Sequence, residues 1–189
     1  MKSGIPDDGN SETYFKMTRL LCKQNHHAAA CYVHVPFCPR KCAYCDFYSL
    51  PADARDQRAW QGAVAEELRL RAGLLRRPVD TIYVGGGTPT CLPGEQLQAV
   101  LSLLGPLAGG RTEFSVEANP ATITDEVARL LARAGVGRVT LGAQSFVPAE
   151  LRRLRRAHGP DAPAAAAGML RSAGIDNIGY VHAAARGEP

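Results

Sequence analysis

Short apolar runs rich in β-branched residues alternate along the chain with longer segments whose apolar residues recur at helical spacing. Five runs are expected as strands: 31–35, 81–84, 112–116, 138–141 and a last one that begins near Asn177. The segments between them are expected as helices: 54–75, 93–104, 124–135 and 148–173, the last broken near Gly159 and Pro160. Residues 1–28 show no such pattern, and we expect a disordered or loosely packed tail there.

The strand–helix unit repeats about every 30 residues, which is typical of βαβ units and a parallel sheet. Right-handed crossovers curl such units towards a barrel or a doubly wound sheet, and four units cannot close a barrel of eight. The expected fold is therefore α/β, a partial open (βα) barrel of parallel strands with about four βα units and a fifth strand.

The composition is that of a soluble globular protein, with 46% hydrophobic and 21% charged residues. No stretch approaches the length of a membrane span, and the first residues lack the apolar core of a signal peptide, so we expect a cytoplasmic protein. The net charge of +4 is small and both signs are scattered, which argues against a dedicated nucleic-acid binder.

Unusual residues follow each of the first four predicted strands. A cysteine-rich segment at 38–45 follows the first strand, and three glycines with Thr88 and Pro89 follow the second. Residues 117–120 and 144–146 follow the third and fourth strands. The carboxyl ends of strands carry the site in α/β folds, so we expect the four segments to converge on one rim.

Cys38, Cys42 and Cys45 form a C-x3-C-x2-C cluster, whereas Cys31 and Cys91 stand alone and are expected to be small buried hydrophobes. Three thiolates at this spacing suit an iron–sulfur cube and leave one iron without a protein ligand. Two alternatives remain: a zinc site completed by His34, and a structural cluster with a remote fourth cysteine.

The other residues of the expected rim have plainer alternatives. The glycines allow close approach of a ligand to the backbone, or they make only a turn. Glu117 could accept hydrogen bonds from ribose hydroxyls, or it is an exposed solvated carboxylate. Gln144 is alternatively a satisfied buried amide. Of the four arginines between residues 152 and 156, we expect three to form only a solvated helix face.

The chain resembles the radical S-adenosylmethionine (SAM) enzymes, and among them the group of oxygen-independent coproporphyrinogen III oxidases and HemW heme chaperones. The resemblance rests on five segments: Tyr32-Val-His-Val-Pro-Phe-Cys38, the C-x3-C-x2-C loop, Gly-Gly-Gly-Thr-Pro-Thr90, Glu-Ala-Asn-Pro120 and Gly-Ala-Gln-Ser-Phe146. It runs from about Tyr32 to Asn177.

The resemblance implies a [4Fe–4S] cluster on Cys38, Cys42 and Cys45, with SAM bound at the open iron and cleaved to start radical chemistry. It implies contacts to this SAM from Tyr32, Gly86 and Glu117. Five further residues match positions that hold a second SAM in the oxidases: Tyr44, Gly87, Thr88, Gln144 and Arg156.

Two departures from the family pattern matter. The oxidases tend to have another cysteine two residues after the third ligand, whereas Asp46 and Phe47 follow Cys45 here, as in the HemW branch. The family continues past Asn177 with an aspartate that falls on Val181 here. We therefore expect residues 29–189 to be the N-terminal part of a radical SAM core domain whose C-terminal remainder is missing.

Three functions are compatible with these features. The first is a HemW-like protein that binds heme and passes it to partner proteins. The second is an oxidase that decarboxylates coproporphyrinogen III in porphyrin biosynthesis, and the third is a non-functional truncated fragment. The resemblance implies SAM, heme or a porphyrinogen, and an electron donor such as flavodoxin or ferredoxin as partners, with heme bound by the full-length protein.

Overall fold

The computed structural model describes residues 29–183, so the tail predicted for residues 1–28 lies outside the described residues. In chain order the elements are β1 (Ala30–Val35), β2 (Phe37–Cys38), β3 (Leu50–Pro51), α2 (Ala54–Arg71), β4 (Thr81–Gly86), α3 (Gly94–Leu104), β5 (Glu113–Ala118), α4 (Asp125–Arg133), β6 (Arg138–Gln144), α5 (Pro148–Arg153), α6 (Ala162–Ser172) and β7 (Asn177–His182). None of the helices in this part of the chain has the length and apolar character needed to cross a membrane.

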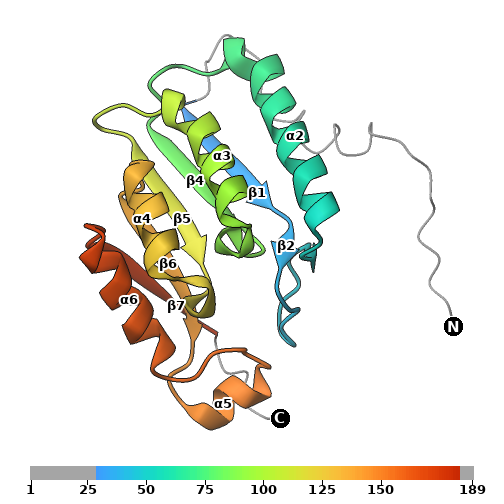
Figure 1. Cartoon of the computed structure of the whole chain (residues 1–189), viewed down its shortest axis with the longest axis vertical. Helices are drawn as coiled ribbons and strands as arrows, with labels where there is room; N and C mark the ends of the chain where they lie inside the picture. The colour runs from blue at the N-terminus through green and yellow to red at the C-terminus, as the bar shows by residue number, and fades with distance from the viewer. Residues whose placement is uncertain (1–28, 184–189) are drawn as a thin grey trace, which may run out of the picture.

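Five strands form one parallel sheet in the order β1-β4-β5-β6-β7. Neighbours in this sheet are also consecutive along the chain once the short β2 and β3 are set aside, so the connecting helices are crossovers between adjacent strands. Figure 1 shows the strands fanned side by side with helices lying over them. The predicted α/β fold, an open partial barrel of parallel strands, is confirmed.

One face of the sheet is apolar and lies beneath the helices. Buried and more exposed residues alternate along β4 and β6, and Ile82, Val84, Val139 and Leu141 are almost completely buried. Helices α2, α3, α4 and α6 lie over the sheet (Figure 1), and their apolar residues join the strands in one core. Each fully buried side chain of this kind contributes about 1.5–3 kcal/mol, which keeps the helices on this face.

The opposite face carries polar and aromatic side chains. Tyr32 of β1 and Tyr83 of β4 are register partners, and their rings stack with centroids 6.0 Å apart. Tyr32 is 59% exposed. Glu117 of β5 is half-buried, and it lies on the same face because Tyr83 pairs with Ser115 two residues earlier. This face leads to the strand ends where the predicted site residues lie.

The predicted helix boundaries have clear physical causes. The Asp53 side chain accepts hydrogen bonds from the first backbone N–H groups of α2, and Thr124 accepts one from Val127 at the start of α4. Gly135 follows α4 with a φ of +81°, the left-handed conformation that ends helices. The predicted cap and end of this helix are confirmed.

Several elements differ from the predicted bounds, and one was not predicted. β4 and β5 each run two residues further than predicted, to Gly86 and Ala118, and the last predicted helix is divided into α5 and α6. α2 ends at Arg71 and continues as a short 3-10 turn, and β6 extends to Gln144 because β7 pairs with it as far as His182. The unpredicted element is a two-stranded parallel sheet, in which Phe37–Cys38 pairs with Leu50–Pro51. These short strands close the loop that carries the three clustered cysteines.

Candidate functional site

The segments that follow the first four strands of the sheet contact one another at the carboxyl ends of those strands. The Cys38 Sγ lies 3.5 Å from the Thr88 Oγ1, which joins the cysteine loop to the segment after β4. The Gly86 backbone N–H donates to Glu117 Oε2 at 3.0 Å, which joins β4 to β5. Arg156, beyond β6, donates to the Cys42 Sγ at 3.2 Å. The structure thus brings residues distant in sequence to a single rim.

The three clustered thiols are half-buried: Cys38 ends β2, and Cys42 and Cys45 lie on the loop between β2 and β3. The Cys45 N–H donates to the Cys42 carbonyl at 3.4 Å, so the last two cysteines belong to one turn. Within residues 29–183, no group of three His, Cys, Asp or Glu side chains is gathered closely enough to hold a metal ion. The chemistry of the three cysteines nevertheless fits a [4Fe–4S] cluster, because thiolates are the usual ligands of the irons in such clusters. The cysteine loop would bring the three sulfurs together around the bound cluster.

Cys42 has two polar neighbours, Arg156 and Tyr44. The pKa of Tyr44 is raised to about 12, first by burial and further by the nearby Cys42. A phenol with this pKa stays protonated at neutral pH and remains a hydrogen-bond donor. Two donors therefore face this one sulfur, as is common around cluster ligands.

Glu117 is not a free solvated carboxylate. It accepts hydrogen bonds from the Tyr83 hydroxyl at 2.6 Å and from the Gly86 N–H at 3.0 Å. Burial, followed by the bond to Glu117, raises the pKa of Tyr83. Tyr32 stacks on Tyr83 and its hydroxyl lies 3.0 Å from the His34 Nδ1. The carboxylate is thus held in a fixed orientation at the end of β5.

His34, the ligand of the alternative zinc site, is engaged through both ring nitrogens. The Nδ1 lies beside the Tyr32 hydroxyl, and the Nε2 lies 3.3 Å from the carbonyl oxygen of Tyr48. Its backbone carbonyl also accepts a hydrogen bond from the Trp60 indole at 3.1 Å, which ties α2 to β1. These contacts hold His34 in position within the rim.

Gly85 and Gly86 end β4 and Gly87 follows it, and close protein neighbours leave little room for a side chain at any of the three. A Cβ at Gly85 would lie 2.7 Å from the Tyr83 ring, and one at Gly86 would lie 2.6 Å from the His34 ring. A Cβ at Gly87 would lie 2.4 Å from the carbonyl oxygen of Phe37, which is backbone. The sequence suggested turn or ligand roles for these glycines, and the structure adds close packing against Tyr83, His34 and the backbone of Phe37.

We expect Gly87→Ala to lower the free energy of unfolding by about 2 kcal/mol, because overpacking against fixed backbone typically costs 1–3 kcal/mol. Urea denaturation would measure the loss. Gly62→Ala is the matched control: Gly62 is exposed inside α2 with nothing within 4 Å of an added Cβ. That variant should gain about 0.5–1 kcal/mol from helix propensity. Equal stabilities for the two variants would contradict the close packing at Gly87.

Gln144 ends β6 in a left-handed conformation, with a φ of +66°. Few non-glycine residues adopt it, and such residues cluster at functional sites. The side chain is half-buried, and its Nε2 would lie 3.0 Å from a Cβ at Gly142, so it folds back over that residue. The Gly142 carbonyl also accepts from Arg156 Nη2 at 2.6 Å. Gln144 and Arg156 therefore meet at Gly142.

The four arginines between residues 152 and 156 differ in exposure. Arg152, Arg153 and Arg155 are exposed, and only Arg156 is half-buried and reaches the rim. Sequence reasoning missed His158, whose buried ring lies 3.3 Å from the Arg156 Nε. It also missed Tyr83. A lone histidine beyond a basic run, or a tyrosine inside a strand, gives no signal of such a role.

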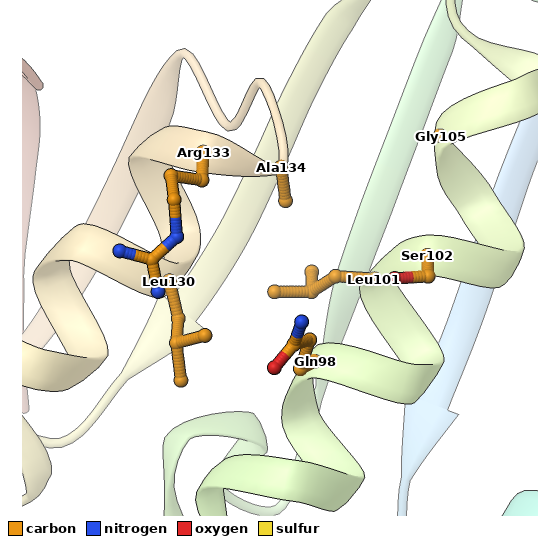
Figure 2. A pocket seen from close by; sticks show the side chains of 7 residues that line it. All are labelled: Gln98, Leu101, Ser102, Gly105, Leu130, Arg133 and Ala134. Carbon is orange, nitrogen blue, oxygen red and sulfur yellow. The ribbon is translucent and has the colours of Figure 1, made fainter.

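A surface cavity of about 400 Å³ lies between α3 and α4, away from these residues. Figure 2 shows Gln98 and Leu101 of α3 facing Leu130 of α4 across it. It shares no residue with the predicted site and is lined by the outer helical layer. The open strand-end rim is therefore the better candidate site.

The isolated Cys31 and Cys91 are half-buried and pack against the core, as predicted. Burial raises the pKa of Cys91 from 9.0 to about 12, with a further contribution from Cys38. The folded chain therefore holds this proton more tightly than the unfolded chain.

We expect the free energy of unfolding to fall as the pH rises above about 9, because the unfolded chain then loses the Cys91 proton first. With a partly exposed thiol the loss should be about 1 kcal/mol between pH 8 and pH 10, measured by urea denaturation. Cys91→Val keeps the volume without the proton and should show a shallower decline. Identical slopes for both proteins would show that Cys91 does not titrate as described.

The chain is similar to proteins of known family over most of its length. Residues 32–189 match the radical SAM superfamily. The heme chaperone HemW of Mycobacterium tuberculosis (strain CDC 1551 / Oshkosh) is 40% identical over 153 residues, which cover 78% of this chain and 39% of that protein. HemW of Escherichia coli (strain K12) is 36% identical over 158 residues, which cover 80% of this chain and 42% of that protein.

A solved structure is also similar. The coproporphyrinogen III oxidase HemN from Escherichia coli, described as a radical SAM enzyme, superposes with a TM-score of 0.74 at 26% identity, covering 82% of this chain and 37% of that chain. The chain thus spans about two fifths of the length of these relatives.

The family implies a [4Fe–4S] cluster and SAM. These are the two groups predicted from the sequence for the cysteine loop and the rim. The resemblance drawn from the sequence motifs is confirmed by the match over residues 32–189 and by the shared fold. The chain belongs to the radical SAM superfamily.

Proposed function

We propose that this chain is the N-terminal part of a HemW-like radical SAM protein, which binds a [4Fe–4S] cluster and SAM and takes part in heme binding and transfer to partner proteins. The observation that carries the proposal is the contact of the cysteine loop with the ends of the next strands on one open rim. The identity of 40% and 36% to two HemW heme chaperones supports the HemW branch.

Cys38, Cys42 and Cys45 would hold the cluster, which supplies one electron and an iron with an open position. Around it, Arg156 donates a hydrogen bond to the Cys42 sulfur, the Tyr44 hydroxyl lies near that sulfur, and Thr88 lies beside the Cys38 sulfur. These residues fix the orientation of the sulfurs and partly shield them from water.

Tyr32, Gly86 and Glu117 would contact the SAM bound at the open iron. Gly86 and Glu117 lie at the ends of β4 and β5, and Tyr32, within β1, stacks on Tyr83, whose hydroxyl already orients the Glu117 carboxylate. The residues that match a second SAM position lie on the same rim: Tyr44, Gly87, Thr88, Gln144 and Arg156. Arg156 already donates hydrogen bonds to the Cys42 sulfur and the Gly142 carbonyl, so a second SAM would compete with these two acceptors for the guanidinium.

Heme would be the cargo, and a cytoplasmic electron donor such as flavodoxin or ferredoxin would reduce the cluster. The alternative function is oxidative decarboxylation of coproporphyrinogen III, which the similarity to the Escherichia coli oxidase favours. Asp46 and Phe47 directly after the third cysteine favour the chaperone. Both functions would use the same rim.

Two anaerobic assays on the cluster-loaded full-length protein, of which this chain would be the N-terminal part, test the proposal. The first titrates heme and follows its visible absorption, and the second supplies coproporphyrinogen III with SAM and a reductant and measures the decarboxylated product. The chaperone proposal expects saturable heme binding without product. Product formation would establish the oxidase instead, and neither activity with a loaded cluster would contradict both.

A further inference from the structure

His158 is a buried polar group that the proposed function leaves without a role. It lies between α5 and α6, and its side chain is among the few buried polar ones, with the residue 6% exposed. Its ring makes two polar contacts: the Nε2 lies 3.3 Å from the Arg156 Nε, and the Nδ1 lies 3.0 Å from the Gly159 carbonyl oxygen. A buried ring with both nitrogens engaged is held in one orientation.

The two partners determine which ring nitrogen carries the proton. The Arg156 Nε has a hydrogen to donate and cannot accept, so the His158 Nε2 must be the acceptor. The Gly159 carbonyl can only accept, so the Nδ1 must be the donor. His158 is therefore neutral with its proton on Nδ1, and it supplies a lone pair to the guanidinium.

The backbone before Arg156 turns its side chain towards the rim. Arg155 follows the end of α5 with a φ of +54°, and the Arg156 N–H donates to the Leu151 carbonyl at 2.9 Å. This is the hydrogen-bond pattern that ends a helix with a left-handed residue. The chain reverses there, and Arg156 is half-buried whereas its neighbours Arg152 and Arg155 are exposed.

All three nitrogens of the Arg156 guanidinium have partners. The Nε donates to His158, the Nη1 to the Cys42 sulfur at 3.2 Å, and the Nη2 to the Gly142 carbonyl at 2.6 Å. A planar fork with three fixed contacts has little freedom left, so its position at the sulfur depends on each of them. Losing the His158 contact would leave the Arg156 Nε without its acceptor and would let the guanidinium move away from the Cys42 sulfur.

We propose that His158 is a positioning residue, which holds Arg156 against the Cys42 sulfur so that this hydrogen bond raises the reduction potential of the cluster. The inference rests on the proposed function, since Cys42 must be a cluster ligand. Hydrogen bonds to the sulfurs tune the potential of iron–sulfur clusters, and a cationic donor favours the more negative, reduced state. Arg156 would thus make the cluster easier to reduce.

Two substitutions separate the contacts of the histidine. His158→Gln can place an amide oxygen near the former Nε2 and keep an acceptor for Arg156. His158→Asn can place an amide near the former Nδ1, which keeps the bond to Gly159 and loses the acceptor. Both remove the ring, so an effect of lost packing would appear in both variants.

The measurement is a redox titration of the anaerobically reconstituted chain, followed by electron paramagnetic resonance, with iron content matched between variants. We expect Arg156→Gln and His158→Asn to lower the potential by about 59 mV, a tenfold change in the ratio of reduced to oxidised cluster. His158→Gln should stay near the unmodified chain. Equal potentials for the Asn and Gln variants, or no shift in Arg156→Gln, would overturn the proposal.

A second measurement needs no cluster. In ¹⁵N nuclear magnetic resonance of the metal-free chain, we expect His158 to be protonated at Nδ1, and its Nε2 signal to move in Arg156→Gln. A proton on Nε2, or an unchanged signal, would overturn the positioning role. A chain that binds no iron would instead overturn the proposed function, so the two failures are distinguishable.

Discussion

Replacing any one of Cys38, Cys42 or Cys45 by alanine should abolish cluster binding. Anaerobic reconstitution of the unmodified chain should give roughly four irons per chain and a broad absorption near about 400 nm, as expected for a cubane held by cysteines. Three protein ligands are the minimum here, because one iron must stay open for SAM, so the loss of one thiolate leaves too few. Iron analysis and absorbance spectra would measure the loss.

Cys31→Ala and Cys91→Ala are the matched controls. Both thiols are half-buried against the core, and the Cys91 Sγ lies 3.5 Å from the Phe37 carbonyl oxygen. Their replacement should leave the iron content unchanged at some cost in stability. Stoichiometric zinc in place of iron after anaerobic expression would contradict the cluster assignment.

Glu117→Gln should weaken SAM binding to the loaded chain by roughly ten- to a hundredfold. The carboxylate would accept hydrogen bonds from the ribose hydroxyls, and losing a charge-assisted contact typically costs about 1.5–3 kcal/mol. The Tyr83 hydroxyl and the Gly86 N–H fix its orientation, and either can still donate to the glutamine oxygen. The variant should therefore keep its fold and its cluster. Calorimetric titration with SAM measures the change.

Glu113→Gln is the control for this variant, because Glu113 begins the strand that Glu117 nearly ends. Glu113 is exposed at the other end of β5 from Glu117, and it accepts a hydrogen bond from the Ser115 hydroxyl at 3.0 Å. Its replacement should change the affinity for SAM by no more than about 0.5 kcal/mol. Equal affinities for the two variants would mean that β5 does not reach SAM.

Much of this architecture could be predicted because strand and helix periodicities are local and strong. The convergence on one rim followed from a single physical rule, since parallel strands end at the same edge of a sheet. The extra β2–β3 pair could not be predicted, because two-residue strands have no periodicity. It forms where the Leu50 N–H donates to the Pro36 carbonyl at 2.6 Å, a contact set by the return of the loop.

The details of the site depend on contacts between residues far apart in sequence. Whether Arg156 or one of its neighbours reaches Cys42 is decided by the left-handed Arg155, a conformation that the sequence does not signal. The burial of His158 and the close approach of Gly87 to Phe37 likewise arise only when the segments are packed. These features appear only in three dimensions.

Electron paramagnetic resonance of the reduced, reconstituted chain with and without SAM tests the central claim most directly. The claim is that the cysteine loop and the ends of β1, β4 and β5 together form one site for cluster and SAM. The signal of the reduced cluster should change on adding SAM to the unmodified chain, and Glu117→Gln should need a higher concentration for the same change. A fully loaded cluster whose spectrum is unchanged at saturating SAM would contradict the account.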